Sequence, residues 1–130
     1  MPDSNGIASI ASPFSVGVTL EKLKAFIAGK GLNLFAHIDH RAGAIAAGLQ
    51  MQPAHVLIFG HAKAGTPLMV ASPLLALDLP LKVLVWAEPG QGTFVSYTAP
   101  AALAARYSLN PDTAAALEAV NGLTDALVAA

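Results

Sequence analysis

The order of strand-like and helix-like segments constrains what this chain can fold into. In the first half, strand patterns at residues 7–12, 32–40 and 55–59 alternate with helical patterns at residues 16–30 and 42–49. Strands that alternate with helices in this way indicate a sheet with helices packed against it.

The second half changes to a hairpin followed by helices. Strand patterns at residues 81–86 and 93–97 flank the turn sequence at residues 89–92, Pro-Gly-Gln-Gly. Helical patterns follow at residues 100–107 and from residue 110 onward. We therefore predict an α+β fold in which a mixed or antiparallel sheet carries helices on one face.

Size and composition favour one domain that associates with a second copy. The 130 residues form a single predicted domain, and they are 55% hydrophobic but only 12% charged. A surface so poor in charge is commonly covered by another subunit, so we expect homo-oligomerisation. The seven basic residues are scattered among eight acidic ones, which gives no basic face for nucleic acid.

Other classes of protein are disfavoured by what the chain lacks. It has no cysteine, which removes thiol catalysis, thiolate metal sites and disulfides. Asp78 and Lys82 interrupt the longest apolar region, and residues 1–6 do not resemble a signal peptide. We therefore expect a soluble, cytoplasmic protein with no membrane partner and no cofactor.

The strand pattern at residues 55–59 stands out because three apolar residues follow one another. Val56, Leu57 and Ile58 leave neither face of the strand polar. Such a run predicts burial on both faces and a central place in the sheet.

One candidate site is the sequence His37-Ile38-Asp39-His40. On a strand, His37 and Asp39 share a face, and a carboxylate near an imidazole can orient it for acid–base work. Alternatively, Asp39 or His40 caps the helical turn that follows, and His37 is solvated. The spacing is not a recognised metal-ligand set, so we predict no metal here.

A second candidate is the glycine-rich stretch at residues 60–67. It is interpreted as a loop at residues 60–65, with Thr66 as the cap of a helix that begins at Pro67. Free amides at a helix start can bind a small anion, with His61, Lys63, Gly65 and Thr66 as candidate ligand-binding residues. The alternative is that the glycines only shape the turn and Thr66 only caps the helix.

A third candidate residue follows the helix predicted at residues 67–77, in which Pro73 predicts a kink or break. Asp78 is included among the ligand-binding candidates. An aspartate in this position more commonly bonds backbone amides in a turn, and Lys82 or Lys63 could pair with it.

Three segments, at residues 35–44, 57–69 and 76–83, together resemble the domain-of-unknown-function 302 family. The resemblance covers about residues 7–109, and residues 110–130 look like a helical extension. One departure is that the family usually has Asn-Pro where this chain has His61-Ala62.

The resemblance implies a TBP-like β-α-β(4)-α arrangement and a dimer, but it implies no activity. Combined with the candidate residues, it predicts a homodimeric module that binds a small ligand, with an anion as one candidate. Two alternatives stay open: an enzyme that uses His40 and Asp39 as an acid–base pair on a small polar substrate, and a structural protein that serves assembly.

Overall fold

The computed structural model describes residues 5–129. The sequence-based expectation of no signal peptide concerns residues 1–6, of which residues 1–4 lie outside the described range. The strands are β1 (Ile7–Ser12), β2 (Asn33–Asp39), β3 (Ala54–Gly60), β4 (Leu81–Glu88) and β5 (Gly92–Thr98). The helices are α1 (Val16–Gly29), α2 (His40–Ala46), α3 (Ala62–Ala71), α4 (Pro100–Arg106), α5 (Pro111–Ala114) and α6 (Ala119–Ala129), with 3-10 helices η1 (Pro73–Leu77) and η2 (Ala115–Glu118).

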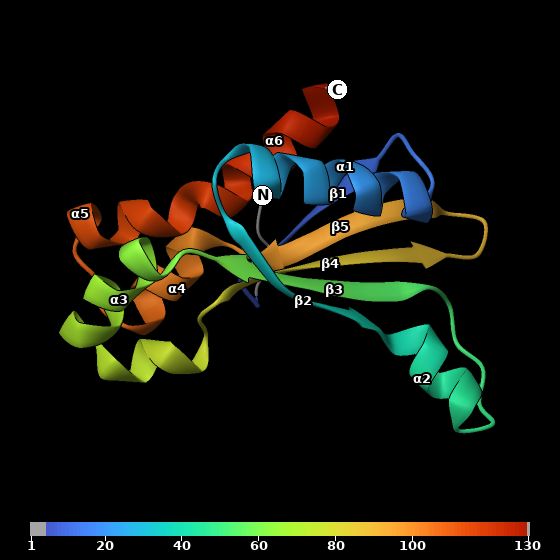
Figure 1. Ribbon diagram of the computed structural model, residues 1–130, viewed down its shortest axis with the longest axis horizontal. Helices are drawn as coiled ribbons and strands as arrows, with labels where there is room; N and C mark the ends of the chain where they lie inside the picture. The colour runs from blue at the N-terminus through green and yellow to red at the C-terminus, as the bar shows by residue number, and fades with distance from the viewer. Residues whose placement is uncertain (1–4, 130) are drawn as a thin grey trace.

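The five strands form one sheet in the order β1-β5-β4-β3-β2, and every neighbouring pair is antiparallel. The predicted hairpin is present, with Glu88 of β4 opposite Gly92 of β5. Figure 1 shows this sheet with α1 and α6 above it, α3, α4 and α5 at one end and α2 at the other. The predicted α+β class and the antiparallel sheet are therefore confirmed.

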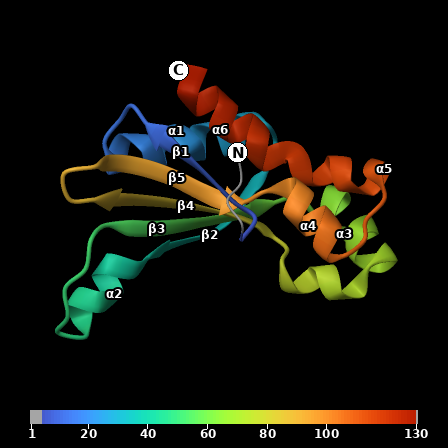
Figure 2. The same cartoon turned by 180° about the vertical axis from the view of Figure 1, so that it is seen from behind.

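The two longer helices beside the sheet, α1 and α6, cover the same face (Figures 1 and 2). Leu20, Leu23 and Ile27 of α1 are buried at helical spacing, as the sequence predicts. They pack in one core cluster with side chains from the sheet and from α6. Its other members are Leu57, Phe59, Val83, Val85, Val95, Val120, Leu123 and Leu127.

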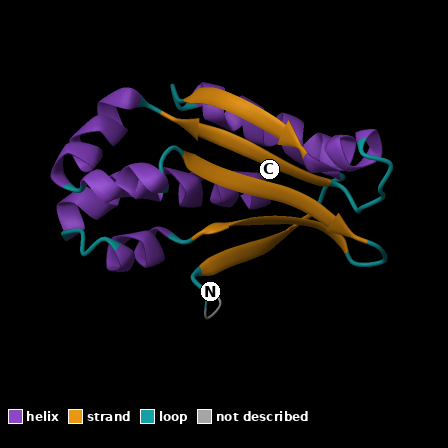
Figure 3. Ribbon diagram, turned by 90° about the horizontal axis from the view of Figure 1, so that it is seen from below, coloured by secondary structure: helices purple, strands orange, loops and turns teal. Residues whose placement is uncertain are grey.

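The opposite face of the sheet is not covered by a helix among the described residues, and Figure 3 shows its strands in front. β3 lies inside the sheet, between β2 and β4, while β4 is the middle strand. Val56 and Ile58 point to the uncovered face and are only half-buried. The expectation of burial on both faces is therefore not met within one chain, because an apolar run does not reveal what covers its second face.

The C-terminal residues belong to the same fold as the rest. Val120, Leu123 and Leu127 of α6 are buried against α1 and the sheet. The Tyr97 hydroxyl of β5 donates to Asn121 Oδ1 at 2.9 Å. The segment that the sequence suggests as an extension thus completes the main core.

A second, smaller core lies at the end of the sheet where β3 stops and β4 starts. It contains Leu68 of α3, Leu75 of η1, Leu103 of α4 and Leu117 of η2. Four elements from separate parts of the chain therefore converge beside the end of the sheet, and the candidate site lies among them.

The helix after β3 begins earlier than the sequence suggests. α3 starts at Ala62, and the ring of His61 caps it by accepting the Lys63 amide at Nδ1 (3.1 Å). Gly65 and Thr66 are therefore helical, and Thr66 is not the cap. Pro67 has no backbone N–H to donate to the carbonyl of Lys63, four residues earlier in α3. The helix tolerates this proline because Lys63 is exposed, so water can reach its carbonyl. The predicted break at Pro73 is confirmed, since α3 ends at Ala71 and η1 begins at Pro73.

Candidate functional site

A cavity of about 250 Å³ lies at the end of the sheet. Its walls come from the start of β2, the β3–α3 junction, the segment that leads into β4, and the η2–α6 junction. The lining residues are Leu32, Phe35, Gly60, His61, Ala62, Ala64, Gly65, Thr66, Leu68, Met69, Leu79, Pro80, Leu81, Ala116, Leu117 and Ala119.

Small residues keep the cavity open at the β3–α3 junction. A Cβ at Gly60 would lie 3.6 Å from the Phe35 ring, and one at Gly65 would lie 3.9 Å from both Leu79 and Met69. Both positions have ordinary contact distances, so the space beside them is not filled by neighbouring side chains. A chain with larger residues here would have a smaller cavity.

The cavity is apolar, and His61 is the one lining residue with an ionisable side chain. Because its Nδ1 accepts the Lys63 amide, a neutral His61 ring carries its proton on Nε2. Within the described chain Nε2 has no hydrogen-bond partner. No carboxylate belongs to the lining, and Lys63 lies exposed nearby on the first turn of α3. The one ionisable side chain that lines the cavity can therefore donate a hydrogen bond or carry a positive charge, and no lining side chain can carry a negative charge.

A second polar cluster lies at the other end of the β2–β3 pair, and it includes a residue that the sequence analysis missed. His37 Nε2 and His55 Nδ1 are 2.9 Å apart, and His55 Nδ1 lies 4.0 Å from Asp39 Oδ2. The antiparallel register places His55 directly opposite Asp39, and this pairing is the signal that would have identified it. The predicted shared face of His37 and Asp39 is confirmed.

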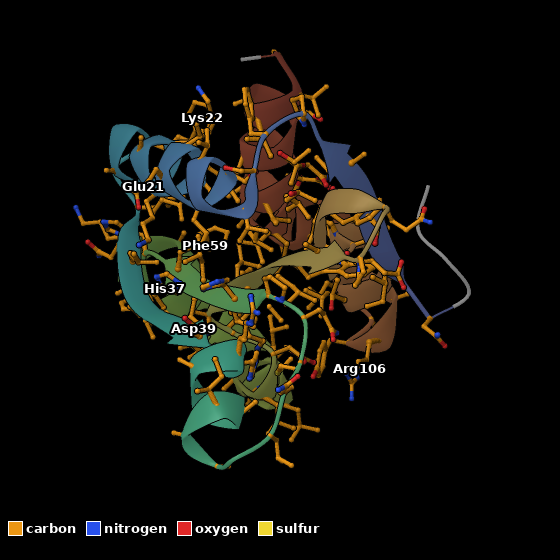
Figure 4. All side chains as sticks on the ribbon, turned by 90° about the vertical axis from the view of Figure 1, so that its right-hand side faces the viewer. Glu21, Lys22, His37, Asp39, Phe59 and Arg106 are labelled. Atoms are coloured by element: carbon orange, nitrogen blue, oxygen red, sulfur yellow. The ribbon has the colours of Figure 1, made fainter. Side chains whose placement is uncertain are left out.

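Burial and neighbouring charges set the protonation of this cluster. Burial is the main reason that the pKa of His37 lies below its ordinary value, and the positive charges of Lys24 and His55 lower it further. Figure 4 shows His37 and Asp39 on β2 and Glu21 on the neighbouring helix α1. The neutral form of His37, which can share one proton with His55, is therefore favoured.

Asp39 has a structural task, which was one of the two alternatives. It caps α2 by accepting the Ala42 amide at Oδ1 (2.9 Å), and this bond lowers the pKa of Asp39. His40 is the exposed first residue of α2, and its side chain makes no hydrogen bond or ion pair with any described residue. Asp39 is therefore placed beside His55 and not paired with His40.

Asp78 joins η1 to α4. Its Oδ2 accepts a hydrogen bond from the Tyr107 hydroxyl and one from Arg106 Nη1 (3.2 Å). The bond to Asp78 raises the pKa of Tyr107. Its observed partners are thus Tyr107 and Arg106, and not the lysines considered from the sequence.

The two candidate motifs do not meet. In the β2–β3 ladder Asp39 pairs with His55, whereas Asn33 pairs with Gly60. Asp39 and His40 therefore lie at one end of β2, roughly 20 Å along the ladder from His61, and His37, which pairs with Leu57, lies about 13 Å from His61. Gly65 and Thr66 lie beyond the same end of the ladder as His61. Among residues 5–129, no group of three or more histidine, aspartate or glutamate side chains is arranged to hold a metal ion.

The fold and the sequence together define the family. The model of the family described as domain of unknown function DUF302 matches residues 8–129, and the match runs through the C-terminal helices. This chain therefore belongs to the DUF302 family. A crystal structure of an uncharacterized conserved DUF302 protein from Bacillus stearothermophilus superposes with a TM-score of 0.80 at 17% identity, covering 94% of this chain and 95% of the other.

Curated relatives of this chain carry a functional name. The fluoride-specific ion channel FluC 1 of Brucella suis biovar 1 (strain 1330) is 35% identical over 116 residues, which are 89% of this chain and 46% of the relative. The protein of the same name from Brucella abortus biovar 1 (strain 9-941) is also 35% identical, and the match covers 43% of it. The chain thus spans less than half the length of these relatives. In the part of the chain that the structure describes, no helix is both long and apolar enough to cross a membrane.

Proposed function

We propose that this protein is a homodimeric module that binds a small ligand in the cavity between β2, α3 and the η2–α6 junction. The observation that carries the proposal is the cavity itself, about 250 Å³ in volume and walled by four separate segments. Apolar cavities with a few polar groups are the usual form of small-ligand sites. The cavity lies beside the glycine-rich stretch for which the sequence predicts a ligand site, and His61 and residues of α3 line it, which supports the proposal.

Ligand binding can be tested by thermal unfolding with a panel of small aliphatic and aromatic carboxylates, the matching alcohols, phosphate, sulfate and fluoride. A ligand present at 100 times its dissociation constant adds about 2.7 kcal/mol, which raises the Tm of a chain of this size by several degrees. We expect at least one member of the panel to do so.

A matched pair of variants locates the binding. Gly65→Leu fills the cavity wall, whereas Gly43→Leu introduces the same side chain at the fourth residue of α2, where nothing lies within 4 Å. The rise in Tm should be lost in Gly65→Leu and kept in Gly43→Leu. A panel without effect, or an equal rise in both variants, would contradict the proposed site.

The homodimer is supported by the uncovered face of the sheet. Its apolar residues include Val56, Ile58, Leu84 and Trp86, and the Trp86 ring stacks near Phe94 with centroids 5.0 Å apart. At about 4.8 Å between strands and 3.3 Å per residue, five strands give a face of roughly 500 Å² in projection. Side chains enlarge that area toward the ~800 Å² per partner of a stable interface.

Charge placement on the middle strand fits a second copy. Lys82 and Glu88 lie on the uncovered face at opposite ends of β4, which is the middle strand of the sheet. A two-fold axis that lies between the two faces, perpendicular to β4 and level with its middle, brings Lys82 of one copy opposite Glu88 of the other. Two such faces would then form a sandwich with an apolar centre and paired charges at its rim.

The dimer predicts twice the mass of one chain in light scattering after size-exclusion chromatography. Leu84→Glu places a charge in the middle of the face and should yield monomers. Val70→Glu, at an α3 residue that is 76% exposed, is the control and should remain dimeric. A monomeric wild-type protein would refute the homodimer.

The name of the Brucella relatives favours a second candidate function, in which the module accompanies a fluoride channel and binds fluoride. The exposed Lys63 and the start of α3 would be its anion-binding groups. Stabilisation by sodium fluoride but not by sodium chloride, lost in Lys63→Ala, would support it. Equal effects of the two salts would count against it.

The enzyme alternative has less support than binding. It needs His40 and Asp39 to act as a pair, but Asp39 caps α2 and contacts His55. The assembly alternative differs from the main proposal only in the absence of a ligand. A dimer in which no member of the panel raises the Tm would favour assembly.

A further inference from the structure

The body of a ligand for this cavity must be apolar. Of its lining residues, only His61 and Thr66 have polar side chains, and the others are aliphatic, aromatic, glycine or proline. A volume of about 250 Å³ equals about eight water molecules at ~30 Å³ each. A bare inorganic anion would lose its hydration in such a site without enough partners, which is strongly unfavourable.

The head of the ligand must be an acceptor. His61 lines the cavity, and its Nε2 has no hydrogen-bond partner among the described residues. Because Nδ1 accepts the Lys63 amide, Nε2 carries the proton in the neutral ring. No carboxylate lines the cavity to repel a negative charge, and exposed Lys63 is the sequence neighbour of the lining residues Ala62 and Ala64. A negatively charged head group that accepts hydrogen bonds, such as a carboxylate, therefore fits the Nε2–H donor of His61.

We infer that the cavity binds a small apolar monocarboxylate, with its hydrocarbon body against Leu79, Met69 and Leu117 and its carboxylate on Nε2 of His61. This inference rests on the proposed binding function and names its ligand class. Benzoate, with about nine non-hydrogen atoms, and hexanoate are suitable probes by size.

The test compares benzoate, benzyl alcohol and phosphate by isothermal titration calorimetry. The variants are wild type, His61→Asn and His61→Asp, chosen because asparagine and aspartate are favoured caps that preserve the start of α3. A hydrogen bond to a charged group corresponds to about a tenfold or larger change in affinity. Wild type should therefore bind benzoate at least about tenfold more tightly than benzyl alcohol.

The variants separate the head of the ligand from its body. His61→Asn should lose most of this preference for benzoate, and His61→Asp should reverse it, because an aspartate repels the carboxylate but can accept a hydrogen bond from the hydroxyl of benzyl alcohol. Equal binding of benzoate and benzyl alcohol to wild type, or tighter binding of phosphate, would overturn the inference but leave the binding function standing. Absence of binding by every probe, including the wider panel above, would overturn both.

Discussion

Substituting Gly65 by alanine should stabilise the protein, because this glycine costs helix stability and borders unfilled space. Gly65 is the fourth residue of α3 and has ordinary helical backbone. An added Cβ would lie 3.9 Å from Leu79 Cδ1 and 3.9 Å from Met69 Cε, which is van der Waals contact without a clash. Neither backbone strain nor overlap opposes the methyl group.

The gain can be estimated from two contributions. Alanine is about 1 kcal/mol more favourable than glycine inside a helix. A methyl group that packs on the cavity wall adds up to about 0.8 kcal/mol, and less here because the cavity is partly open to solvent. The free energy of unfolding should therefore rise by about 1–1.5 kcal/mol, and the Tm by several degrees.

Gly43→Ala separates the two contributions. Gly43 is the fourth residue of α2, and a Cβ there would meet nothing within 4 Å. It therefore tests propensity alone, with a gain of at most about 1 kcal/mol. Urea unfolding of both variants measures the difference. If Gly65→Ala is destabilised, or gains no more than Gly43→Ala, the cavity wall is not arranged as described.

Three further predictions concern the cores and the polar cluster. Leu117→Ala, which truncates a fully buried side chain, should cost about 2–5 kcal/mol in chemical unfolding. Asp39→Ala removes the cap that accepts the Ala42 amide, so circular dichroism should report less helix and a lower Tm. His37 has a pKa lowered by burial, so its contribution to stability is present above about pH 6.5 and is lost as the pH falls through the folded-state pKa. His37→Gln should therefore show a weaker loss of stability on acidification than wild type, and an unchanged pH profile would contradict this account.

The sheet and the first helix could be predicted because their signals are local. Leu20, Leu23 and Ile27 recur at helical spacing, and the turn at residues 89–92 lies between two alternating segments. Each pattern is contained within a few turns or one hairpin, so no knowledge of the rest of the fold is needed. The family resemblance was likewise carried by short contiguous motifs.

The start of α3 and the cavity could not be predicted in the same way. Threonine followed by proline is a common start of a helix, so the sequence predicts Thr66 as the cap. In the structure the imidazole of His61 caps α3 instead. The cavity depends on the approach of η2 and α6 to α3, and residues 60 and 117 are far apart in the sequence. His55 became a partner of Asp39 only through the register of β2 and β3. Local sequence patterns do not indicate which residues far apart in the sequence come into contact.

The separation of the two polar regions bears on what the protein can do. Acid–base chemistry needs its proton-transferring groups within hydrogen-bond reach of a bound substrate. Along the β2–β3 ladder, Asp39 and His55 lie roughly 20 Å from His61, and His37 lies about 13 Å from it. A group bound to His61 would therefore lie beyond hydrogen-bond reach of His37 and His55, and His61 itself uses Nδ1 to cap α3. The free Nε2 of His61 beside an apolar cavity wall suits recognition of a ligand's polar head group. Ligand binding therefore accounts for the cavity end of the sheet better than catalysis does.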